Sequence, residues 1–357
     1  MTKTNNPTVA LIFGGRGYER DVSIKGADNL FSLIPYEKYD KIPIFIDRDG
    51  RFLMPESDGT APIRMARGEV KMREVYPAYL SGRGGLAYNG GFIPVDAAFP
   101  LLHGDFGEDG VVQGALECAR IAYVGCDALG SAMARDKMLV KTVAKALGIP
   151  IARGVICQIG EENEAIRKAE GELSYPVFVK PTRLGSSFGA SKAENPCELR
   201  QALKTALSLS PRAVIEEYID IEKELECAYF AAKGKELFTN LGEICACGFY
   251  DYEKKYGKIR NTECESAPEV RDYSNVGEEI ESTAREYARR LVHMLSLRDI
   301  SRIDFFLSKG GQLCFNEINT MPGFTNTSLY LRLVERCGIS QVEIISSLID
   351  GAIERGA

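Results

Sequence analysis

The sequence predicts a protein of mixed α/β and α+β architecture that begins with an α/β unit and carries a β-hairpin near its end. An apolar run at residues 9–13 leads into Gly14-Gly15 and then into a helical stretch, which is the order of a strand–turn–helix unit. Two β-rich runs flank Gly310-Gly311, a pair typical of a hairpin turn. With 357 residues, the chain is long enough for two or three domains.

Composition and charge argue against several classes of protein. The net charge of −6 does not suggest a nucleic-acid or anionic-membrane partner, and no run of about 18 apolar residues predicts a membrane span. Residues 1–7 are polar and lead straight into a strand, unlike a signal peptide. The ten cysteines lack metal-type C-x-x-C pairs, so we expect free thiols in a reducing cytoplasm. With two histidines and no Ser-His-Asp pattern, a hydrolase is a weak interpretation.

Further strands are expected at residues 41–47 and 95–102, with short edge strands and a loop insertion between them and a helix from about residue 111. The glycines after the first strand do not match G-x-G-x-x-G, so a nicotinamide site is not expected. Glu19 lies in the first turn of the first helix, where it either compensates the helix dipole or binds a ligand. His103 follows the third strand, and a lone histidine is more often structural than catalytic.

The middle of the chain alternates helices and strands. Helices are expected at residues 136–147, 161–170 and 196–208, and strands at 152–157, 176–179 and 214–219, with Glu224 on the next strand. The Gly/Ser-rich loop 180–189, flanked by Lys180 and Lys192, either cradles phosphate oxygens or is a mobile surface turn. The aromatic, charged stretch 249–256 is a candidate lid over a ligand. A helix at 276–297 precedes the hairpin, and two helices close the chain.

The hairpin predicts a cluster of polar side chains. If Gly310-Gly311 is a two-residue loop, Asp304 lies opposite Glu317 and Arg302 lies opposite Asn319. Side chains alternate between the two faces of a strand, so all four groups are expected on one face.

Two carboxylates placed opposite each other, Asp304 and Glu317, repel unless a cation compensates them. Carboxylate and amide oxygens suit Mg²⁺, and Arg302 beside them offers a forked donor to phosphate or to an oxyanion. Phe306 and Phe315 are expected to continue this face as an apolar floor. The alternative is a solvated polar face with an Arg–Asp pair, and the hairpin alone does not decide between the two.

Taken together, these motifs resemble those of the ATP-grasp superfamily and, within it, the D-alanine–D-alanine ligase family. They run in family order over nearly the whole chain, which makes the resemblance specific and favours Mg²⁺ at the hairpin. The matching pieces are Gly14-Gly15 with Glu19 and Val22-Ser23, residues 103–110 with Gln113-Gly114, Ser131 with Asp136-Lys137 and Lys141, residues 180–189 with Lys192, residues 249–256, Arg302 with Asp304, and residues 316–325.

The chain departs from the family pattern at several places. Gly17 stands where the family usually has Ser, and Arg20 stands where it often has His. Segment 257–270 lacks the usual Pro-Ala ending. An apparent one-residue insertion near residues 220–223 precedes Glu224, the acid matched to the ribose side. These differences bear on second-substrate preference and loop closure rather than on the ATP chemistry.

The resemblance implies an ATP-grasp fold in three domains. These are an N-terminal Rossmann-like substrate domain (1–127), a small central lid domain (128–220) and a C-terminal catalytic domain (221–357). ATP is expected between the second and third domains, and the amino acids between the first and third. The family also implies a cytoplasmic homodimer without a nucleic-acid or membrane partner.

The reaction implied by the resemblance is the ATP-dependent joining of two D-alanines through an acyl phosphate, for peptidoglycan precursor synthesis, with ATP as co-substrate and two Mg²⁺ or Mn²⁺ ions. The matched catalytic residues are Glu19, Ser186, Tyr256 and Arg302, and the matched substrate-binding residues are His103, Gly323, Ser328 and Leu329. The matched ATP-binding residues are Lys137, Lys180, Ser187, Glu216, Glu217, Tyr218, Ile219, Glu224 and Lys255, and the matched metal ligands are Asp304, Glu317 and Asn319.

Two other functions stay open. One is a related ligase of the glycopeptide-resistance type that makes D-alanyl-D-serine or D-alanyl-D-lactate, and the other is a non-catalytic nucleotide-binding protein. Family members that make D-alanyl-D-lactate replace the Tyr-bearing lid with a His-containing segment, whereas Lys255-Tyr256 is kept here. Members that make D-alanyl-D-serine tend to carry a larger polar or basic residue in place of Leu329. We therefore expect D-alanine as the second substrate.

Overall fold

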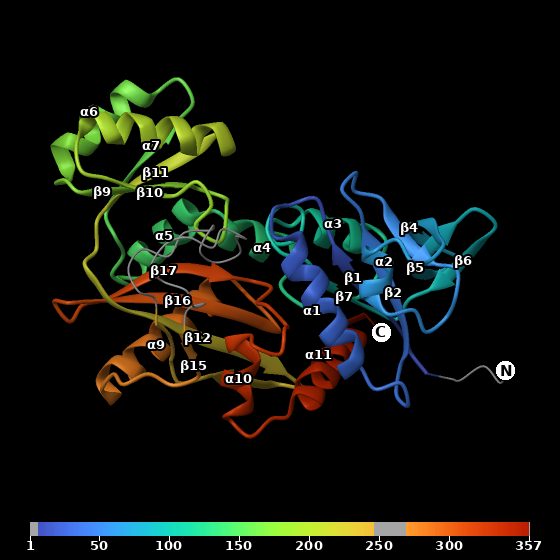
Figure 1. Ribbon diagram of the computed structural model, residues 1–357. Helices are drawn as coiled ribbons and strands as arrows, with labels where there is room; N and C mark the ends of the chain where they lie inside the picture. The colour runs from blue at the N-terminus through green and yellow to red at the C-terminus, as the bar shows by residue number, and fades with distance from the viewer. Residues whose placement is uncertain (1–5, 246–268, 357) are drawn as a thin grey trace.

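The computed structural model of the protein describes residues 6–245 and 269–356 (Figure 1). Three β-sheets organise this part of the chain, one after another along the sequence. The expected lid 249–256, with the candidate residues Lys255 and Tyr256, lies outside the described residues. Within the described ranges, no helix is long and apolar enough to cross a membrane.

The N-terminal sheet has seven strands in the order β6-β5-β4-β3-β2-β1-β7. They are β1 (Thr8–Gly14), β2 (Asp40–Ile46), β3 (Phe52–Pro55), β4 (Met72–Leu80), β5 (Arg83–Tyr88), β6 (Gly91–Pro94) and β7 (Ala97–Leu101). β1 pairs in parallel with β2 and β7, whereas β3 to β6 extend one edge in antiparallel pairs. The expected edge strands are therefore present, together with the short helix α2 (Pro62–Ala66).

Helices cover both faces of the parallel strands, which is why β1 is apolar along its length. α1 (Arg20–Leu33) and the last helix, α11 (Gln341–Gly356), pack on one face, and α3 (Val111–Cys118) packs on the other. Ser23 on α1 joins the layers, because its Oγ accepts the Gly14 N–H at 2.8 Å and donates to the Leu101 carbonyl at 2.5 Å. The matched Val22-Ser23 motif therefore has a structural role at this position.

The central sheet has four strands in the order β10-β9-β11-β8. They are β8 (Gly154–Gln158), β9 (Val177–Pro181), β10 (Ser191–Ala193) and β11 (Arg212–Glu217). α6 (Glu162–Glu172) and α7 (Pro196–Leu209) lie side by side on one face and bury residues such as Ile166 and Leu203 (Figure 1). The opposite face carries Lys180 and Glu216, and Lys180 contacts Asn316 of the C-terminal sheet.

The C-terminal sheet runs in the order β15-β14-β12-β16-β17, with β13 beside β12. Its strands are β12 (Ile221–Ala232), β13 (Lys235–Phe238), β14 (Gly242–Cys245), β15 (Glu269–Arg271), β16 (Ile300–Ser308) and β17 (Leu313–Asn319). One register shift separates Ile221 from Lys223 on β12, so the apparent insertion near residues 220–223 forms a β-bulge. α10 (Leu329–Glu335) and α11 attach this sheet to the core of the N-terminal sheet.

Helices α4 (Ala128–Arg135), α5 (Lys137–Ala146) and α9 (Glu278–Met294) share one core with the C-terminal sheet. Ala134 and Val140, for example, are buried with Leu291 and Phe305. α4 and α5 therefore pack on the C-terminal sheet, although the resemblance implies a central domain that begins at residue 128. The domain boundaries stay a prediction.

The hairpin of β16 and β17 brings together the four polar residues that the sequence predicts. Arg302 lies opposite Asn319, and Asp304 lies opposite Glu317. Arg302 and Asn319 both donate hydrogen bonds to Asp304, so these side chains share one face. Ile303, on the other face of β16, is buried in the core.

The turn of this hairpin differs from the prediction. A hydrogen bond of 3.0 Å from the Ser308 N–H to the Gln312 carbonyl, with φ +80° at Gly311, defines a three-residue turn rather than a two-residue turn. The longer turn shifts the pairing by one residue, and a β-bulge at Asn316 shifts it back. Phe315 lies on the turn side of the bulge and is buried in the core, so its expected place on the polar face is wrong.

Candidate active site

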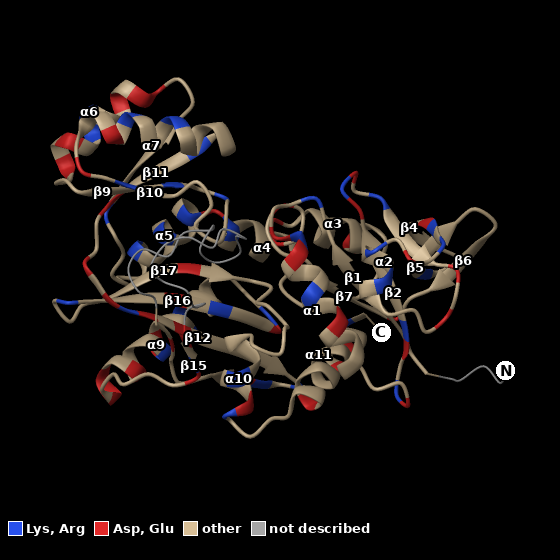
Figure 2. Cartoon of the chain, in the orientation of Figure 1, with Lys and Arg blue, Asp and Glu red and all other residues tan. Residues whose placement is uncertain are grey.

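The polar face of the hairpin, the N-terminus of α5 and the central sheet meet in one charged region. Figure 2 shows charged segments of both signs along β16 and β17, below the central sheet. Lys137 is the first residue of α5, and the side chain of Asp136 caps this helix by accepting the Met138 and Leu139 N–H groups. This cap fixes where α5 begins and so places Lys137 beside the hairpin.

Three lysines and two carboxylates form ion pairs there. Lys137 Nζ lies 2.8 Å from Glu317 Oε2. Glu216 holds two ammonium groups, that of Lys141 and that of Lys180, the latter at 3.0 Å. The predicted phosphate-binding lysines, Lys137 and Lys180, are therefore brought together, and Lys141 joins them.

Glu216, Glu317 and Lys141 are ionised near neutral pH. Burial raises the pKa of the Glu216 carboxyl, but Lys141 and Lys180 outweigh it and lower the pKa to about 2. Burial lowers the pKa of Lys141 to about 8, because the attraction of Glu216 offsets only part of the desolvation. Burial also opposes ionisation of Glu317, yet Lys137 holds the pKa of Glu317 below its usual range.

The bulge on β17 has a role in this network. A bulge turns two successive side chains to the same side of a strand. Asn316 accepts a hydrogen bond of 3.4 Å from Lys180, while its neighbour Glu317 pairs with Lys137. The Lys180 ammonium also lies 5.8 Å from the centre of the Phe306 ring, which therefore forms part of the apolar floor as expected.

Arg302 neutralises the other carboxylate of the hairpin. Its Nε and Nη2 donate to the two oxygens of Asp304 at 2.8 and 2.7 Å, and its Nε lies 3.2 Å from Glu226 Oε1. Asn319 donates to Asp304 Oδ2 at 3.0 Å. Burial by itself lowers the pKa of Arg302, but the nearby carboxylates raise it well above its usual value. Asp304 and Glu317 therefore face each other without net repulsion, because Arg302 balances one and Lys137 balances the other.

The hairpin residues fit a magnesium ion by the chemistry of their donor set. The described ranges contain no group of three His, Cys, Asp or Glu side chains that could hold a metal by itself. Asp304, Glu317 and Asn319 supply two carboxylates and one amide oxygen, and Mg²⁺ commonly takes one or two carboxylates plus phosphate oxygens. A carboxylate has about four lone-pair positions, so Asp304 can keep its Arg302 contact while it binds a cation.

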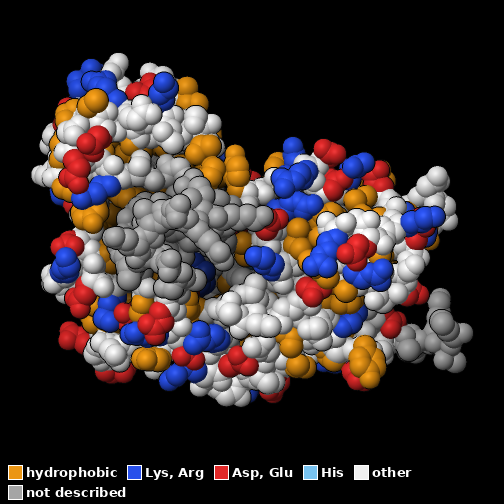
Figure 3. Space-filling model, in the orientation of Figure 1, with side chains coloured by type: hydrophobic (Ala, Val, Ile, Leu, Met, Phe, Trp, Pro, Cys, Tyr) orange, Lys and Arg blue, Asp and Glu red, His pale blue; other side chains and the backbone are white. Residues whose placement is uncertain are grey.

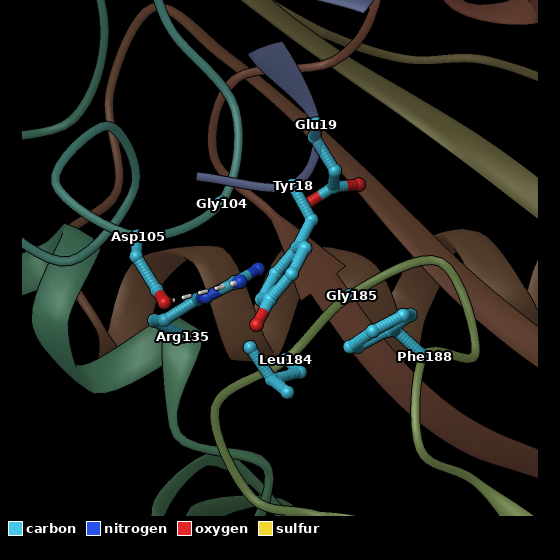
Figure 4. A pocket seen from close by; sticks show the side chains of 8 residues that line it. All are labelled: Tyr18, Glu19, Gly104, Asp105, Arg135, Leu184, Gly185 and Phe188. Carbon is cyan, nitrogen blue, oxygen red and sulfur yellow. Dashed lines mark ion pairs between the residues drawn. The ribbon is translucent and has the colours of Figure 1, made fainter. Parts of the chain in front are cut away.

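Glu19 marks a second part of the site, at the N-terminus of α1. Its Oε1 accepts a hydrogen bond of 2.5 Å from Ser186 Oγ, so two predicted residues from distant segments are in contact. A Cβ atom on Gly104 or Gly185 would lie 2.9 or 3.0 Å from Glu19 Oε2, so the carboxylate packs directly between two stretches of backbone. Around it lies a cavity of about 10 Å³ (Figure 4), roughly the room that one water molecule needs.

The loop after β9 closes over this cavity. The Phe188 ring stacks on Tyr18 with 4.4 Å between ring centres. Ser186 and Ser187 have φ of 51° and 57°, a left-handed conformation that costs non-glycine residues about 1–3 kcal/mol each. The Ser186–Glu19 hydrogen bond and the aromatic stack hold the loop in this shape.

Arg135 is a buried cation beside Glu19 that sequence reasoning did not single out. Its side chain is 8% exposed and lies 3.5 Å from Glu108 and 3.7 Å from Asp105 (Figure 4, dashed line to Asp105). Burial raises the pKa of Glu108, and Arg135 offsets only part of that effect. Glu108 also accepts the Gly104 N–H at 2.9 Å, so the ion pair fixes the loop that follows β7.

His103 links that loop to the segment after the hairpin. Its Nδ1 lies 3.1 Å from the Met321 carbonyl oxygen, and because a carbonyl only accepts, Nδ1 carries the proton. Its Nε2 is buried and has no hydrogen-bond partner among the residues that the structure describes. His103 therefore has one ring nitrogen available to a ligand.

The other predicted nucleotide-binding residues lie around the linker between β11 and β12. The Glu217 carboxylate pairs with Arg153 at 2.8 Å, and Lys192 lies 4.5 Å from the centre of the Tyr218 ring. Ile219 follows in the linker, and the resemblance gives its backbone, not its side chain, a role in adenine binding. Glu224 lies two residues before Glu226 on β12, so both face the same side as Arg302. Ser187 lies in the loop after β9.

The residues predicted for the second substrate lie after the hairpin. Ser328 accepts the Thr325 N–H at 2.9 Å, and a Cβ on Gly323 would lie 2.9 Å from Ser328 Oγ. Leu329 is 6% exposed and packs in the core against Gly242. Their contact with a substrate stays a prediction.

The sequence assigned no site role to five residues of this region: Arg135, Glu108, Lys141, Glu226 and Asn316. Three of them, Glu108, Lys141 and Asn316, belong to motifs that match the family. Glu226 has a signal in the sequence, because it follows Glu224 at strand spacing. Lys141 lies one helical turn after Lys137, which places both on one face of α5. Asn316 required the bulge, and the Arg135–Glu108 pair joins two segments whose meeting no local pattern predicts.

The arrangement suits the transfer of a phosphoryl group to a small substrate. It combines cations for phosphate oxygens, oxygen ligands for a divalent ion and a forked guanidinium beside them. A small closed cavity with a carboxylate adjoins it, and that carboxylate suits a substrate ammonium.

Comparisons with known proteins agree with this arrangement. A model of the D-ala D-ala ligase N-terminus matches residues 8–126, and a model of the D-ala D-ala ligase C-terminus matches residues 143–350. D-alanine–D-alanine ligase A of Mesorhizobium japonicum is 39% identical over 97% of this chain and 97% of its own length. D-alanine–D-alanine ligase of Enterococcus faecalis is 35% identical over 97% of this chain and 99% of its own length.

Solved structures agree as well. The VanG D-Ala:D-Ser ligase from Enterococcus faecalis superposes with a TM-score of 0.87 at 31% identity, covering 98% of this chain and 100% of that one. The D-alanine–D-alanine ligase from Coxiella burnetii superposes with a TM-score of 0.84 at 26% identity, covering 99% and 95%. The chain therefore belongs to the D-alanine–D-alanine ligase family, as its motifs predict, and has the ATP-grasp fold.

Proposed function

We propose that this protein joins two D-alanines into D-alanyl-D-alanine, with conversion of ATP to ADP and phosphate, for peptidoglycan precursor synthesis. The observation that carries the proposal is the convergence of three cations on the hairpin beside the Glu19 cavity: Lys137 on Glu317, Arg302 on Asp304 and Lys180 on Asn316. A protein that only bound nucleotide would not need this combination. The relatives named above carry the same activity in their names.

The first D-alanine is held by residues from the N-terminal sheet and the loop after β9. The Glu19 carboxylate binds its ammonium group and keeps its hydrogen bond to Ser186. The Nε2 atom of His103 faces its carboxylate, because Nδ1 is already committed to Met321. Since the cavity has only about 10 Å³, the Tyr18–Phe188 stack has to open before an amino acid enters.

In the first step, a carboxylate oxygen of this D-alanine attacks the γ-phosphorus of ATP, and ADP leaves with the electron pair of the broken P–O bond. Lys137 and Lys180 balance the phosphate charge at this step. Both are paired with carboxylates in the structure, so they exchange these partners for phosphate oxygens. Asp304, Glu317 and Asn319 would hold two Mg²⁺ or Mn²⁺ ions, which supply positive charge to the phosphates.

In the second step, the uncharged amine of the second D-alanine attacks the carbonyl carbon of the acyl phosphate. The C–O bond to phosphate breaks, and the proton that the nitrogen loses leaves with the phosphate. The tetrahedral intermediate carries an oxyanion. Arg302, whose fork lies on Asp304, donates to that oxyanion together with backbone amides near Gly323. Preorganised donors of this kind supply about 3–4 kcal/mol each to such intermediates.

The remaining roles follow the family match. Glu216 and the backbone of residues 217–219 bind adenine, Glu224 binds ribose, and Ser187 with Lys255 contacts the phosphates. The family match gives Tyr256 a catalytic role together with Glu19 and Ser186. Ser328 and Leu329 border the second substrate. We further propose a cytoplasmic homodimer, in keeping with the family expectation.

The first test is release of ADP from ATP on addition of D-alanine and Mg²⁺, with D-alanyl-D-alanine identified by mass. A protein that binds nucleotide but releases no ADP under these conditions would be a non-catalytic member of the family. The same assay without D-alanine is the control for uncoupled ATP hydrolysis.

The second test concerns the second substrate, since one structural relative is named as a D-Ala:D-Ser ligase. Leu329 offers no hydrogen-bond partner to a serine hydroxyl, which costs about 1–3 kcal/mol if the hydroxyl stays unpaired. We expect a tenfold to hundredfold preference for D-alanine. Equal D-alanine and D-serine, or D-alanine and D-lactate, are supplied in competition near neutral pH. An excess of mixed product would overturn the assigned second substrate and leave the ligase chemistry intact.

A further inference from the structure

A second pocket opens at the carboxyl ends of the three parallel strands of the N-terminal sheet. Its volume is about 440 Å³, and it is lined by Arg16 after β1, Arg48 after β2 and Phe106 after β7. In the sheet, β1 lies between β2 and β7, so the connection from β1 leads to one side and β7 is added on the other side. Open α/β sheets bind ligands at such a point, outside the carboxyl ends of their strands.

Three arginines give this pocket its charge. Arg16, Arg20 and Arg48 all line it, and none of their guanidinium groups forms a hydrogen bond or an ion pair with another described residue. Nε and Nη1 of Arg20 are buried and have no hydrogen-bond partner within the described ranges. Figure 3 shows Lys and Arg side chains on the upper side of the N-terminal part of the molecule, with Asp and Glu side chains among them.

Aromatic rings hold two of these guanidinium groups in place. The Arg16 guanidinium lies 4.4 Å from the centre of the Phe106 ring, and that of Arg20 lies 4.6 Å from the centre of the Phe45 ring. Such stacking fixes the plane of a guanidinium and leaves its N–H groups free to bind another partner. Two of the three cations are therefore held in position before any ligand arrives.

The nearby carboxylates do not balance this charge. Asp47 is engaged by Arg51, with 2.6 Å between the charged groups, and Asp105 is paired with Arg135. Asp21 is exposed on α1 and is the remaining acid that lines the pocket. Burial, and the proximity of Arg48, lower the pKa of Arg20, and Asp21 and Asp47 offset only part of this effect. The pocket thus holds an excess of positive charge, to which the N-terminus of α1 adds.

We propose that this pocket binds a small anion through a phosphate group, at a site separate from the ATP and D-alanine sites. Guanidinium forks match phosphate oxygens in pairs, and three converging forks suit a multiply charged phosphate better than a single carboxylate. The cavity is also large enough for a phosphate that carries a further group. The proposal does not rest on the ligase activity, because it concerns binding alone.

The test is calorimetric titration of the full chain with inorganic pyrophosphate in metal-free buffer at about 0.15 M salt. Tyr18 and Asp105 line both this pocket and the first-substrate cavity, so the titration is repeated with saturating ADP and D-alanine. We expect binding of one pyrophosphate to persist under these conditions. Complete loss of the binding with ADP present would assign the pyrophosphate to the nucleotide site and overturn the proposal.

Variants locate the site. Arg48 is exposed, so Arg48→Gln should fold normally and bind pyrophosphate at least about tenfold more weakly, as should Arg16→Gln. Arg83→Gln is the matched control, because Arg83 is an exposed arginine of the same sheet outside the pocket. Unchanged affinity in both Arg48→Gln and Arg16→Gln would overturn the proposal. Equal affinity for malonate, a dicarboxylate, would overturn the choice of phosphate as the recognised group.

Discussion

The buried ion triad of Glu216, Lys141 and Lys180 gives the sharpest test of how the site is held together. Glu216 and Lys141 are each 2% exposed and the Lys180 side chain is 14% exposed, so Lys141 cannot turn to water and Lys180 reaches it only in part. Glu216→Gln keeps the shape of the side chain but leaves two cations in the interior without their counter-charge. Breaking a buried ion pair in this way costs about 3–5 kcal/mol.

The pKa of Glu216 gives a similar value for the free energy that these ion pairs contribute to stability. Its fall from 4.5 to about 2 on folding corresponds to about 3 kcal/mol of stability. Because the folded-state pKa lies below the unfolded value, this stability is present above about pH 4.5 and is lost as the pH falls toward 2. The Glu216→Gln variant should therefore be less stable at pH 7 and lose less stability on acidification than the wild type.

Urea unfolding at pH 7 measures the effect, with Glu217→Gln as the matched control. Glu217 is the next residue of β11, and its partner Arg153 is 68% exposed, so its loss should cost less than about 1 kcal/mol. Adding Lys141→Met to Glu216→Gln removes one stranded charge and should recover part of the stability. If Glu216→Gln and Glu217→Gln unfold within about 1 kcal/mol of each other with equal m-values, the triad does not stabilise the fold as argued.

Other predictions concern the hairpin. Glu317→Ala removes a metal ligand and frees Lys137, so we expect near-complete loss of ADP formation with far-ultraviolet circular dichroism unchanged; substantial turnover at moderate Mg²⁺ would falsify its role. Arg302→Lys keeps the charge but not the fork on Asp304, so we expect at least a hundredfold fall in kcat with nucleotide affinity within about threefold, measured by steady-state kinetics and calorimetry. Chelation of divalent ions should weaken ATP binding more than tenfold, since Glu317 then stays paired with Lys137 and competes with the phosphates; equal affinity with and without Mg²⁺ would contradict this competition.

The hairpin shows what sequence patterns determine and what they do not. Alternation and β-propensity locate both strands, and the pairing of Asp304 with Glu317 follows from the assumed two-residue turn. That turn is wrong, and the pairing is still right, because the bulge at Asn316 cancels the extra turn residue. A Gly-Gly pair permits either turn, and no local rule places a bulge, so only the final packing of β17 against its neighbours selects this combination.

The first-substrate cavity marks the other limit. The contact between Glu19 and Ser186 spans 167 positions and follows from the family match, not from periodicity. Neither the family match nor the periodicity of the sequence predicts Arg135 as a site residue, because nothing in the sequence near it indicates a buried charge at the end of α4. Its partners Glu108 and Asp105 come from the loop after β7. The cost of burying the Arg135 guanidinium is offset only when that loop is folded against α4.

The pairing of charges within the site bears on how it accepts its substrates. Lys137 is paired with Glu317, Lys180 with Glu216, and Arg302 with Asp304, so the described part of the site is close to neutral before any ligand binds. A triphosphate that enters alone would be repelled by the carboxylates, and this repulsion would offset its attraction to the lysines. If divalent cations enter with it, Asp304 and Glu317 would hold the metal, which would leave Lys137 free for phosphate oxygens. These ion pairs thus favour binding of the nucleotide together with divalent cations over binding of the bare nucleotide.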